Sequence, residues 1–497
     1  MADWIVKMAG DVAWAAAYGL GLFAFAGSVD TQGPGVAAVP GTPTLVLGEY
    51  DLAPLGYRTD EFFVSGTASS YKLAGPESED GRWDAVAAAS APYTTRIVVV
   101  RPTDPRKFNG TVVVEWLNVS AGADGAPDWN ATHREIIRSG YAYVGVSAQK
   151  AGIEGGGLMP IAAAAGLKKA DPQRYAPLNH PGDAFSYDIF SQIAELLRSA
   201  SSGQVLGGLA AKRVLAMGES QSAAFLTTYA NAIDRLAKAY DGFLIHSRFG
   251  GASSLESGAM IAQGGPRFVK FRPDLRVPVL AVITETDLLV DNIPGYSGAR
   301  QPDNDRLRVW EVAGTAHADM YTFSAGRIDS GSESLEKLEA ANRPTNSVLG
   351  STVAKPINNA LQHHYVTEAA LASLDHWVRA GRAAPAAAPI QLTPGDHPSF
   401  VLDANGLAAG GVRTPWVNVP TARLSGVGNS GGMLAGMAGV CEPFDEATFA
   451  RLYPGGKKEY LRKFQVSLDA AIEAGFILPA DRKEILGLAE VAYPSAR

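Results

Sequence analysis

Residues 213–233 read RVLAMGESQSAAFLTTYANAI, and this stretch decides the fold. Its first part, Val214 to Met217, is a short apolar run typical of a buried strand, and Gly218 permits a backbone that bulkier residues avoid. From Gln221 onward, apolar residues recur at helical spacing. The stretch therefore predicts a strand, a sharp turn with Ser220 at its apex, and a helix.

The turn matches the nucleophile-elbow pattern G-x-S-x-G except at its last position, where Ser222 stands in place of glycine. Serine is only slightly larger than glycine, so strand and helix can still pass closely. A serine hydroxyl is a weak nucleophile until it is held against a base, and the turn would expose Ser220 to one. The alternative is a chance match in a chain rich in Gly, Ala and Ser, but the flanking strand and helix patterns favour the catalytic interpretation.

The composition is that of an ordinary globular protein. The chain has 497 residues, of which 46% are hydrophobic and 19% charged, so it is not a disordered chain. The formal net charge of -7 offers no basic excess for phosphates, and we expect no nucleic-acid partner. Cys441 is the only cysteine, which excludes an intrachain disulfide and a cysteine-based metal site.

Residues 1–43 form an apolar segment followed by a Gly/Pro-rich linker. Residues 12–26 are uncharged and mostly apolar, and residues 24–26 (AFA) resemble a small-residue cleavage site. Asp3 and Asp11 oppose the positive charge of Lys7 and argue against an export signal, but the apolar run and the small residues still favour a cleaved export signal over a short docked helix. A cytoplasmic location stays open. The rest of the chain has no run of about twenty apolar residues, and we expect no integral membrane span.

Strand-like and helix-like segments alternate through the middle of the chain. This alternation predicts an α/β fold with a mostly parallel central sheet and helices on both faces, preceded by a β-rich part at residues 44–73 and 93–101. The expected strands are residues 111–116, 141–147, 213–217, 242–246, 279–284 and 307–312. The expected helices are residues 128–139, 184–199, 221–240 and 366–380.

An Ala/Pro-rich linker at residues 383–389 separates two expected parts of the chain, a catalytic domain at residues 44–382 and a C-terminal segment at residues 383–497. The C-terminal segment contains an extended stretch broken by prolines at residues 412–420 and helical patterns at residues 459–474 and 480–489. Because it carries no catalytic motif, we expect an appendage packed on the catalytic domain that flanks the sheet or shapes the pocket.

A catalytic serine needs a base and an acid that orients the base. In chains with a nucleophile elbow the order is serine, acid, histidine, and each residue follows a strand because loops gather at one edge of a parallel sheet. His317 follows the strand expected at residues 307–312, and Gly314 lets that loop turn back over the edge. The other histidines lie in helices, in insertions or before the acid, so His317 is the expected base.

Two carboxylates come directly after the strand expected at residues 279–284. Asp287 is the expected acid because the following Leu-Leu-Val resembles the usual acid loop, and Glu285, two residues earlier, stays open as the alternative. Asp291 is a more distant third candidate. A triad of this kind needs no metal and no organic cofactor.

The oxyanion hole should combine the backbone N–H of Gln221 with an N–H from the loop after residues 111–116. That loop reads LNVSAG at residues 117–122, and we expect Leu117 or Asn118 to donate, unless the Asn118 side chain braces the loop instead. Three aromatic residues are candidates for the substrate pocket, although they could equally belong to the core: Trp116, Trp129 and Tyr187.

With these motifs the chain resembles the α/β-hydrolase superfamily and, more narrowly, the bacterial family called alpha/beta hydrolase domain-containing proteins. The resemblance spans nearly the whole chain after residue 45. It implies an esterase-like fold in which Ser222 is normal, but no defined substrate. The Gly-Glu-Ser start of the elbow also resembles carboxylesterases, whose acid is often Glu, and this keeps Glu285 open. The segments that carry the resemblance are DLA (51–53), EFFVSGTA (61–68), VEWLNVS (114–120), GYAYVGVSAQ (140–149), HPGDAFSYDIFSQ (180–192), GESQS (218–222), TETD (284–287) and RTPWV (413–417).

The expected function is that of a serine hydrolase that cleaves carboxylic esters of small molecules through an acyl-enzyme. Ser220 would attack, His317 would move the proton and Asp287 would orient His317. The same triad could serve an amidase, a thioesterase or a peptidase. A non-catalytic binding protein on the same fold would have to keep all three residues unused. The oligomeric state stays open.

Overall fold

Alternate residues of one strand, β4 (Thr111–Trp116), pack on opposite faces of the central sheet. In the computed structural model, which describes residues 33–157, 165–259, 265–290 and 293–494, Val112 and Val114 join one hydrophobic cluster and Val113 joins another. All three side chains are fully buried. A strand buried on both faces is typical of a parallel sheet that helices cover from two sides.

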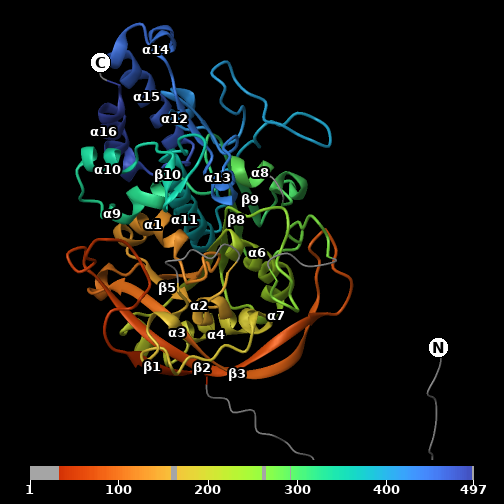
Figure 1. Cartoon of the computed structure of the whole chain (residues 1–497). Coiled ribbons are helices and arrows are strands. Elements are labelled where there is room, and N and C mark those ends of the chain that lie inside the picture. The colour runs from red at the N-terminus through yellow and green to blue at the C-terminus, as the bar shows by residue number, and fades with distance from the viewer. Residues whose placement is uncertain (1–32, 158–164, 260–264, 291–292, 495–497) are drawn as a thin grey trace, which may run out of the picture. The chain divides into compact units, whose positions relative to one another are not determined.

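Within the described residues, nine strands form this sheet in the order β1-β2-β3-β5-β4-β6-β7-β8-β9 (Figure 1). The strands from β5 to β9 in this order pair in parallel, so the expected α/β fold with a mostly parallel sheet is confirmed. Besides β4, the parallel strands are β5 (Ala142–Val146), β6 (Arg213–Glu219), β7 (Gly242–His246), β8 (Val279–Thr284) and β9 (Leu307–Val312).

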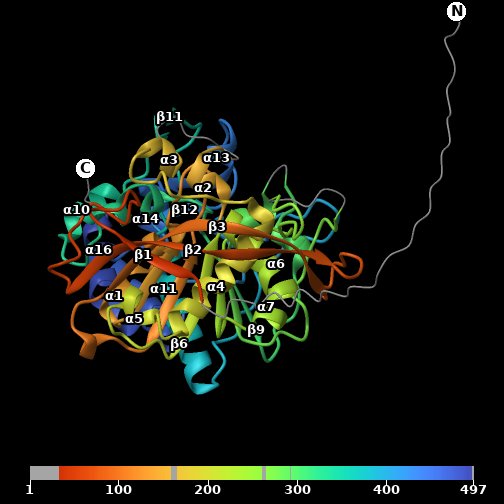
Figure 2. The same ribbon diagram turned by 90° about the horizontal axis from the view of Figure 1, so that it is seen from below.

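The β-rich part expected before the main sheet forms its antiparallel edge. It consists of β1 (Gly35–Val39), β2 (Tyr57–Leu73) and β3 (Ala85–Pro102), which run side by side in Figure 2. The last strand of this group, β3, also pairs antiparallel with β5, so the edge continues the same sheet.

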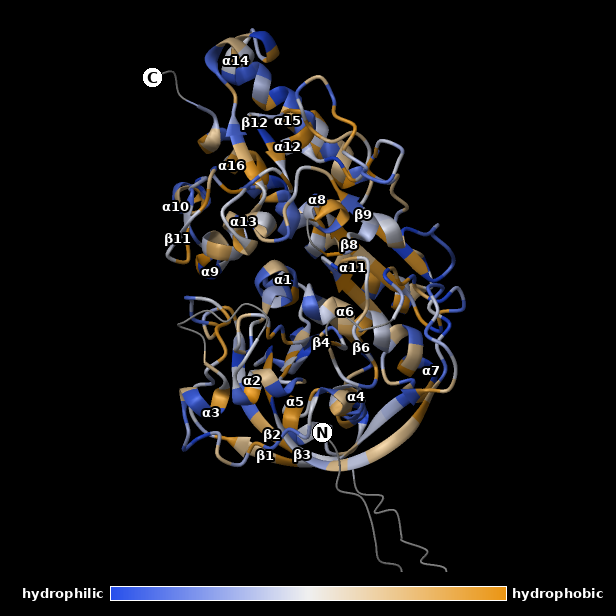
Figure 3. Cartoon of the chain, turned by 45° about the vertical axis from the view of Figure 1, so that its right-hand side comes forward, coloured by the Kyte–Doolittle hydropathy of each residue, from blue (hydrophilic) through white to orange (hydrophobic). Residues whose placement is uncertain are grey.

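Helices cover both faces of the sheet, as expected. On one face α4 (Ser186–Arg198) and α6 (Gln221–Thr228) contribute to the cluster that contains Val112, and on the other α1 (Pro127–Arg138) and α11 (Gln362–Ala380) pack around Val113. The strands between these layers are largely hydrophobic (Figure 3). The helix expected at residues 221–240 is divided by a π-helical turn, Tyr229–Ile233, before α7 (Asp234–Ala237).

The remaining elements are short or lie toward the C-terminus. The α-helices are α2 (Lys150–Glu154), α3 (Leu167–Ala170), α5 (Ser202–Leu206), α8 (Glu285–Leu289), α9 (Gly326–Ile328), α10 (Leu335–Ala341), α12 (Pro415–Asn418), α13 (Met433–Ala438), α14 (Glu446–Leu452), α15 (Gly456–Glu473) and α16 (Arg482–Ala492). Two small hairpins consist of β10 (Ser347–Val348) with β11 (Ser351–Thr352) and β12 (Ala422–Ser425) with β13 (Val440–Pro443). Further turns of 3-10 or π-helix are Pro105–Lys107, Asp183–Phe185, Tyr296–Ala299, Tyr321–Ala325 and Pro479–Asp481.

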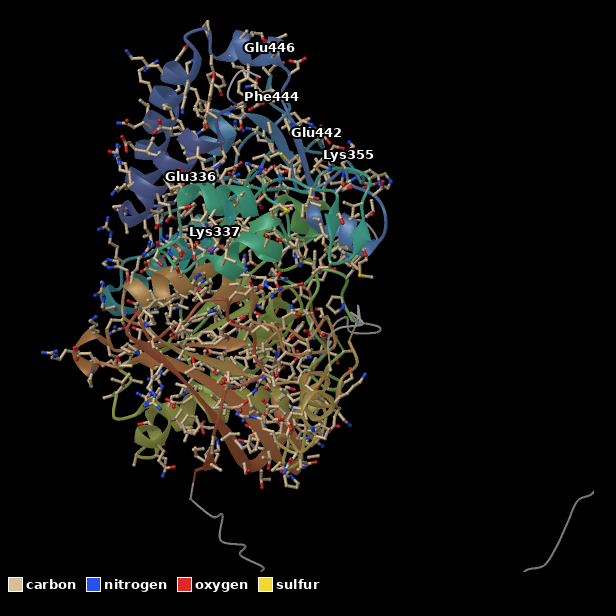
Figure 4. All side chains as sticks on the ribbon, turned by 60° about the vertical axis from the view of Figure 1, so that its left-hand side comes forward. Glu336, Lys337, Lys355, Glu442, Phe444 and Glu446 are labelled. Carbon is tan, nitrogen blue, oxygen red and sulfur yellow. The ribbon has the colours of Figure 1, made fainter. Side chains whose placement is uncertain are left out.

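The C-terminal segment contacts the sheet and its helices directly. Val412 forms a parallel bridge with Val312 at the end of β9. At its far end, Glu484 of α16 accepts hydrogen bonds from Arg134 of α1. Glu442 of β13 also forms an ion pair of 2.9 Å with Lys355, and Figure 4 labels both residues. These contacts make residues from 33 onward one compact unit, while a domain boundary near residue 383 stays a prediction.

Among the helices in the described ranges, none has both the length and the apolar character that crossing a bilayer requires. The apolar segment expected to act as an export signal and the third acid candidate, Asp291, both lie outside the described residues.

Candidate active site

Ser220 lies at the turn between β6 and α6. Its backbone angles, φ 59° and ψ -116°, are disfavoured for any residue other than glycine, which is the strain expected of a nucleophile elbow. The crossing of strand and helix is so close that a Cβ on Gly218 would lie 2.9 Å from Leu226 and 3.1 Å from Ser222. The N–H of Ser220 donates to the carbonyl of His246 at 2.9 Å, which fixes the turn against β7.

The side chains of Ser220, His317 and Asp287 form one hydrogen-bonded row. Nε2 of His317 lies 2.8 Å from Oγ of Ser220, and Nδ1 lies 2.6 Å from Oδ1 of Asp287. With Asp287 ionised, Nδ1 carries a proton and Nε2 can accept the proton of the serine hydroxyl. Phe249 stacks on the imidazole with 5.0 Å between the ring centroids, so the ring is also held from its face. The structure therefore brings together the three residues that the sequence predicts.

A capping box at the start of α8 positions Asp287. The Thr284 hydroxyl accepts the N–H of Asp287 at 3.3 Å, and Oδ2 of Asp287 accepts the N–H of Thr284 at 2.7 Å. Because the N–H of Thr284 occupies Oδ2, the other carboxylate oxygen, Oδ1, is left to face His317. The acid is thus oriented by the helix start on which it stands.

Glu285, the alternative acid, is buried but bonds elsewhere. Its Oε1 accepts the N–H of Gly314 at 2.6 Å, and its Oε2 accepts the Ser425 hydroxyl and the Gly426 N–H, each at 2.9 Å. These contacts join the loop that carries His317 to the C-terminal segment. They give Glu285 a bracing role instead of the acid's place beside His317.

The histidine loop depends on the same contacts. Gly314 has a φ of 74°, which favours glycine, and a Cβ there would lie 2.9 Å from Val417. The N–H of His317 donates to the Thr286 hydroxyl at 3.1 Å, and this hydroxyl donates to the carbonyl of Gly426 at 2.6 Å. The C-terminal segment therefore contacts the neighbours of Asp287 in α8 and, through Thr286 and Glu285, holds the loop that carries His317, a more specific contribution than the appendage expected from the sequence.

Glu219, the residue before the nucleophile, places another carboxylate beside His317. Its Oε1 lies 3.3 Å from Nε2 of His317. Burial alone lowers the pKa of His317, but the carboxylates of Glu219 and Asp287 outweigh it and raise this pKa to about 9. Burial raises the pKa of Glu219 to about 8. Glu219 was not among the expected site residues, since it occupies a variable position of the elbow pattern and entered only through the resemblance of Gly-Glu-Ser to carboxylesterases.

Two N–H groups expected to serve the oxyanion hole are bonded within the fold. The N–H of Leu117 donates to the carbonyl of Val146 at 3.2 Å, and that of Asn118 donates to the carbonyl of Gly125 at 2.9 Å. The expectation that either N–H completes the hole does not fit these bonds. The side chain of Asn118 instead braces the loop, because its Nδ2 donates to the carbonyl of Glu219 at 3.1 Å.

Val119 is the next residue of this loop, and its N–H faces the start of α6. It donates to Oε1 of the Gln221 side chain at 3.3 Å. Gln221 is the first residue of α6, where the helix supplies no partner for the backbone N–H. The side-chain oxygen of Gln221 therefore already occupies the acceptor position in front of the Val119 N–H, next to the turn that carries Ser220.

The three aromatic residues proposed for the substrate pocket are buried in the core. Trp116, Trp129 and Tyr187 are each at most 1% exposed. Trp116 stacks with Phe225 at 5.0 Å between centroids, and Nε1 of Trp129 donates to the carbonyl of Leu47 at 2.6 Å. Packing and internal hydrogen bonds account for these side chains, and the pocket-lining role does not fit their burial.

A small cavity of about 20 Å³ lies beside His317. This volume is enough for about one water molecule. Within the described ranges, no group of three His, Cys, Asp or Glu side chains has an arrangement that could hold a metal ion. The titratable residues that line the cavity are Glu219, His246, His317, Asp319, Tyr321, His363 and His364.

Comparison with solved structures finds distant similarity. A putative dienelactone hydrolase from Klebsiella pneumoniae is 14% identical over 50% of this chain and 85% of its own, with a TM-score of 0.27. Esterase Est22 is 13% identical over 46% of this chain and 64% of its own, with a TM-score of 0.27. A thermostable esterase from Pseudomonas putida is 13% identical over 48% of this chain and 66% of its own, with a TM-score of 0.26. Such low values carry no argument about activity.

Comparison with protein families gives a firmer result. No curated protein matches the chain. The family model described as "Alpha/beta hydrolase domain", however, matches residues 28–487 and so covers most of the sequence. The sheet order, the elbow at Ser220 and this match agree, and the chain belongs to the alpha/beta hydrolase domain family.

Proposed function

We propose that this protein is a serine hydrolase that cleaves carboxylic esters of small molecules. The observation that carries the proposal is the row formed by Asp287, His317 and Ser220, with contacts of 2.6 and 2.8 Å, on a strained strand-to-helix turn. Membership in a hydrolase-fold family is consistent with this chemistry. No step of the reaction requires a metal or an organic cofactor.

In the first half of the reaction, Oγ of Ser220 attacks the ester carbonyl carbon while its proton passes to Nε2 of His317. The new imidazolium lies between the carboxylates of Asp287 and Glu219, which stabilise its charge. The bond to the leaving alcohol then breaks, and His317 returns the proton to the alcohol oxygen. An acyl group remains bound to Ser220.

In the second half, water replaces the alcohol. His317 takes a proton from the water molecule as its oxygen attacks the acyl carbon. The tetrahedral species collapses, the bond to Oγ breaks, and the proton on His317 goes to Ser220. The carboxylic acid leaves and the resting row is restored.

For the oxyanion hole, we propose the N–H groups of Gln221 and Val119 in place of the donors expected from the sequence. The Gln221 side-chain oxygen, which accepts the Val119 N–H at 3.3 Å, stands where an oxyanion would accept the same bond. In the reaction the amide of Gln221 would rotate away. A contact this long is weak enough for a substrate oxygen to displace it.

An active-site label and a matched pair of substrates test this function. A fluorophosphonate probe should label the wild-type protein at Ser220 and leave Ser220→Ala unlabelled. The wild-type protein should hydrolyse p-nitrophenyl acetate much faster than p-nitroacetanilide, since the two share an acyl group and differ in the bond cleaved. Faster cleavage of the anilide would make the protein an amidase, and a folded protein that neither labels nor turns over would be a binding protein.

A further inference from the structure

A second hydrogen-bonded row lies next to the triad and is not part of it. Oδ1 of Asp128 lies 2.8 Å from Nδ1 of His246, and Nε2 of His246 lies 2.8 Å from Nε2 of His363. Nδ1 of His363 then lies 3.2 Å from Oδ2 of Asp319. Each of the four residues is at most 5% exposed. We call these four residues the buried relay.

The buried relay links four separate elements around the elbow. Asp128 stands in the first turn of α1, His246 ends β7, and His363 stands in the first turn of α11. Asp319 follows the catalytic His317 by two residues. Because the carbonyl of His246 also accepts the N–H of Ser220, the relay joins the nucleophile turn to the histidine loop.

The geometry of the buried relay requires a proton in each of its three contacts. Two lone pairs would repel each other across the 2.8 Å between His246 and His363, so one of these nitrogens must carry hydrogen. Two neutral imidazoles supply two protons, and the third must reside on an imidazole or on a carboxyl group. Asp128 can hold it on Oδ1, the oxygen that faces His246, since burial raises the pKa of this carboxyl group to about 8.

Glu219 connects the buried relay with His317. Its carboxylate faces Nε2 of His317 at 3.3 Å on one side and accepts the amide of Asn118 at 3.2 Å on the other. The small cavity beside it is lined by His246 and His363. A charge in the relay is therefore separated from His317 by one carboxylate and a space for about one water molecule.

The signs of the charges around Glu219 define how this connection works. The positive forms of His317 and His363 favour ionised Glu219, whereas the negative charges of Asp128 and Asp287 oppose it. Ionised Glu219 in turn favours protonated His317. The other titratable groups that face the relay are Glu115, which accepts the N–H of Asp128, and Tyr321 and His364, which line the same cavity.

We propose that the buried relay shares a mobile proton and that its charge, acting through Glu219, sets the proton affinity of His317. Glu219 and His363 are then positioning residues, which act on the base and not on the substrate. This inference depends on the proposed function in one respect only, namely that His317 is assigned the role of the base.

The test measures the pH midpoint of His317 by nuclear magnetic resonance of isotope-labelled histidine in the full chain. Glu219→Gln removes the carboxylate but keeps its shape, so the midpoint of His317 should fall by about one pH unit or more. His363→Gln cannot become positive, which leaves Glu219 less often ionised, and should lower the midpoint by a smaller amount. The double variant should show no more than the shift of Glu219→Gln alone.

His364→Gln is the matched control, since it makes the same substitution at the next residue and in the same cavity but outside the buried relay. Its His317 midpoint should equal that of the wild type. If thermal melting shows that His363→Gln does not fold, Asp319→Asn replaces it, and the same smaller fall is expected because a positive His363 loses its partner.

Three results would overturn the relay: an unmoved midpoint in Glu219→Gln, an unmoved midpoint in folded His363→Gln, or a shift from His363→Gln that adds fully to that of Glu219→Gln. The titration does not depend on turnover, so it separates this inference from the proposed function. A shifted midpoint in a protein without ester hydrolysis would remove the function and support the relay. Normal hydrolysis with an unmoved midpoint would support the proposed function and overturn the relay.

Discussion

The carboxylate of Glu219 lies 3.3 Å from Nε2 of His317, the same nitrogen that faces the hydroxyl of Ser220 at 2.8 Å. This nitrogen must be unprotonated to receive the serine proton and protonated to release the alcohol. A neighbouring negative charge opposes the first state and stabilises the second. On the proposed function, the protein therefore needs a higher pH to begin a turnover, and the imidazolium formed during the turnover is more stable.

The first prediction follows from this arrangement and concerns pH. Because the pKa of His317 is raised to about 9, most molecules carry a protonated base at neutral pH, and only the neutral fraction reacts. The value of kcat/KM for p-nitrophenyl acetate should therefore increase as pH rises and level off only above the pKa of His317. Measurement in buffers of constant ionic strength checks this. A plateau already reached at neutral pH would contradict it.

The second prediction separates the two candidate acids. Asp287→Asn leaves the capping contacts possible but can stabilise the wrong imidazole tautomer, so kcat should fall by about ten-thousand-fold with little change in melting temperature. Glu285→Gln should act on folding, since it weakens three buried hydrogen bonds and should reduce the free energy of unfolding by about 1–3 kcal/mol. Its kcat per folded molecule should stay within a few-fold of the wild type.

Kinetics and denaturant unfolding of the two variants provide the comparison. Active Asp287→Asn beside inactive but folded Glu285→Gln would reverse the assignment and make Glu285 the acid.

The parallel part of the central sheet could be predicted because β4, β5, β7 and β8 are buried throughout and therefore read as largely apolar runs. The bounds expected for β4, β7, β8 and β9 coincide with those in the structure. Ser220, Asp287 and His317 could be proposed for the same reason, since each follows such a strand and chain order limits the choice. Local pattern and topology together were sufficient for these positions.

The remaining parts of the site depend on contacts between distant segments. His246 and His363 lie 117 positions apart in the sequence, and they meet only because α11 packs beside the end of β7. The donors Leu117 and Asn118 failed as candidates because loop conformation decides which N–H groups are already bonded. Burial of Trp116 likewise follows from how α4 and α6 pack, which no local pattern specifies.

The third prediction concerns the support that the C-terminal segment gives to the histidine loop. Thr286→Val has nearly the same shape but loses the hydroxyl that accepts the His317 N–H and donates to Gly426. Two buried polar groups lose their partner, so the free energy of unfolding should fall by about 2–5 kcal/mol and kcat should decline as the base loosens. Thr286→Ser keeps the hydroxyl and should restore both. Equal values for the valine and serine variants would show that this hydroxyl is not what holds the loop.

The fourth prediction uses the strained backbone of the nucleophile. Ser220 adopts φ 59° with ψ -116°, a backbone conformation that is unfavourable for residues with a Cβ atom but that glycine tolerates. Both Ser220→Gly and Ser220→Ala remove the nucleophile, so both should be inactive, and they differ in whether the strain remains. Relief of the strain outweighs the extra freedom of glycine in the unfolded chain, so Ser220→Gly should be more stable than Ser220→Ala by about 1 kcal/mol. Urea unfolding of the two inactive proteins measures the difference directly, and an alanine variant as stable as the glycine variant would mean that the turn is not under strain.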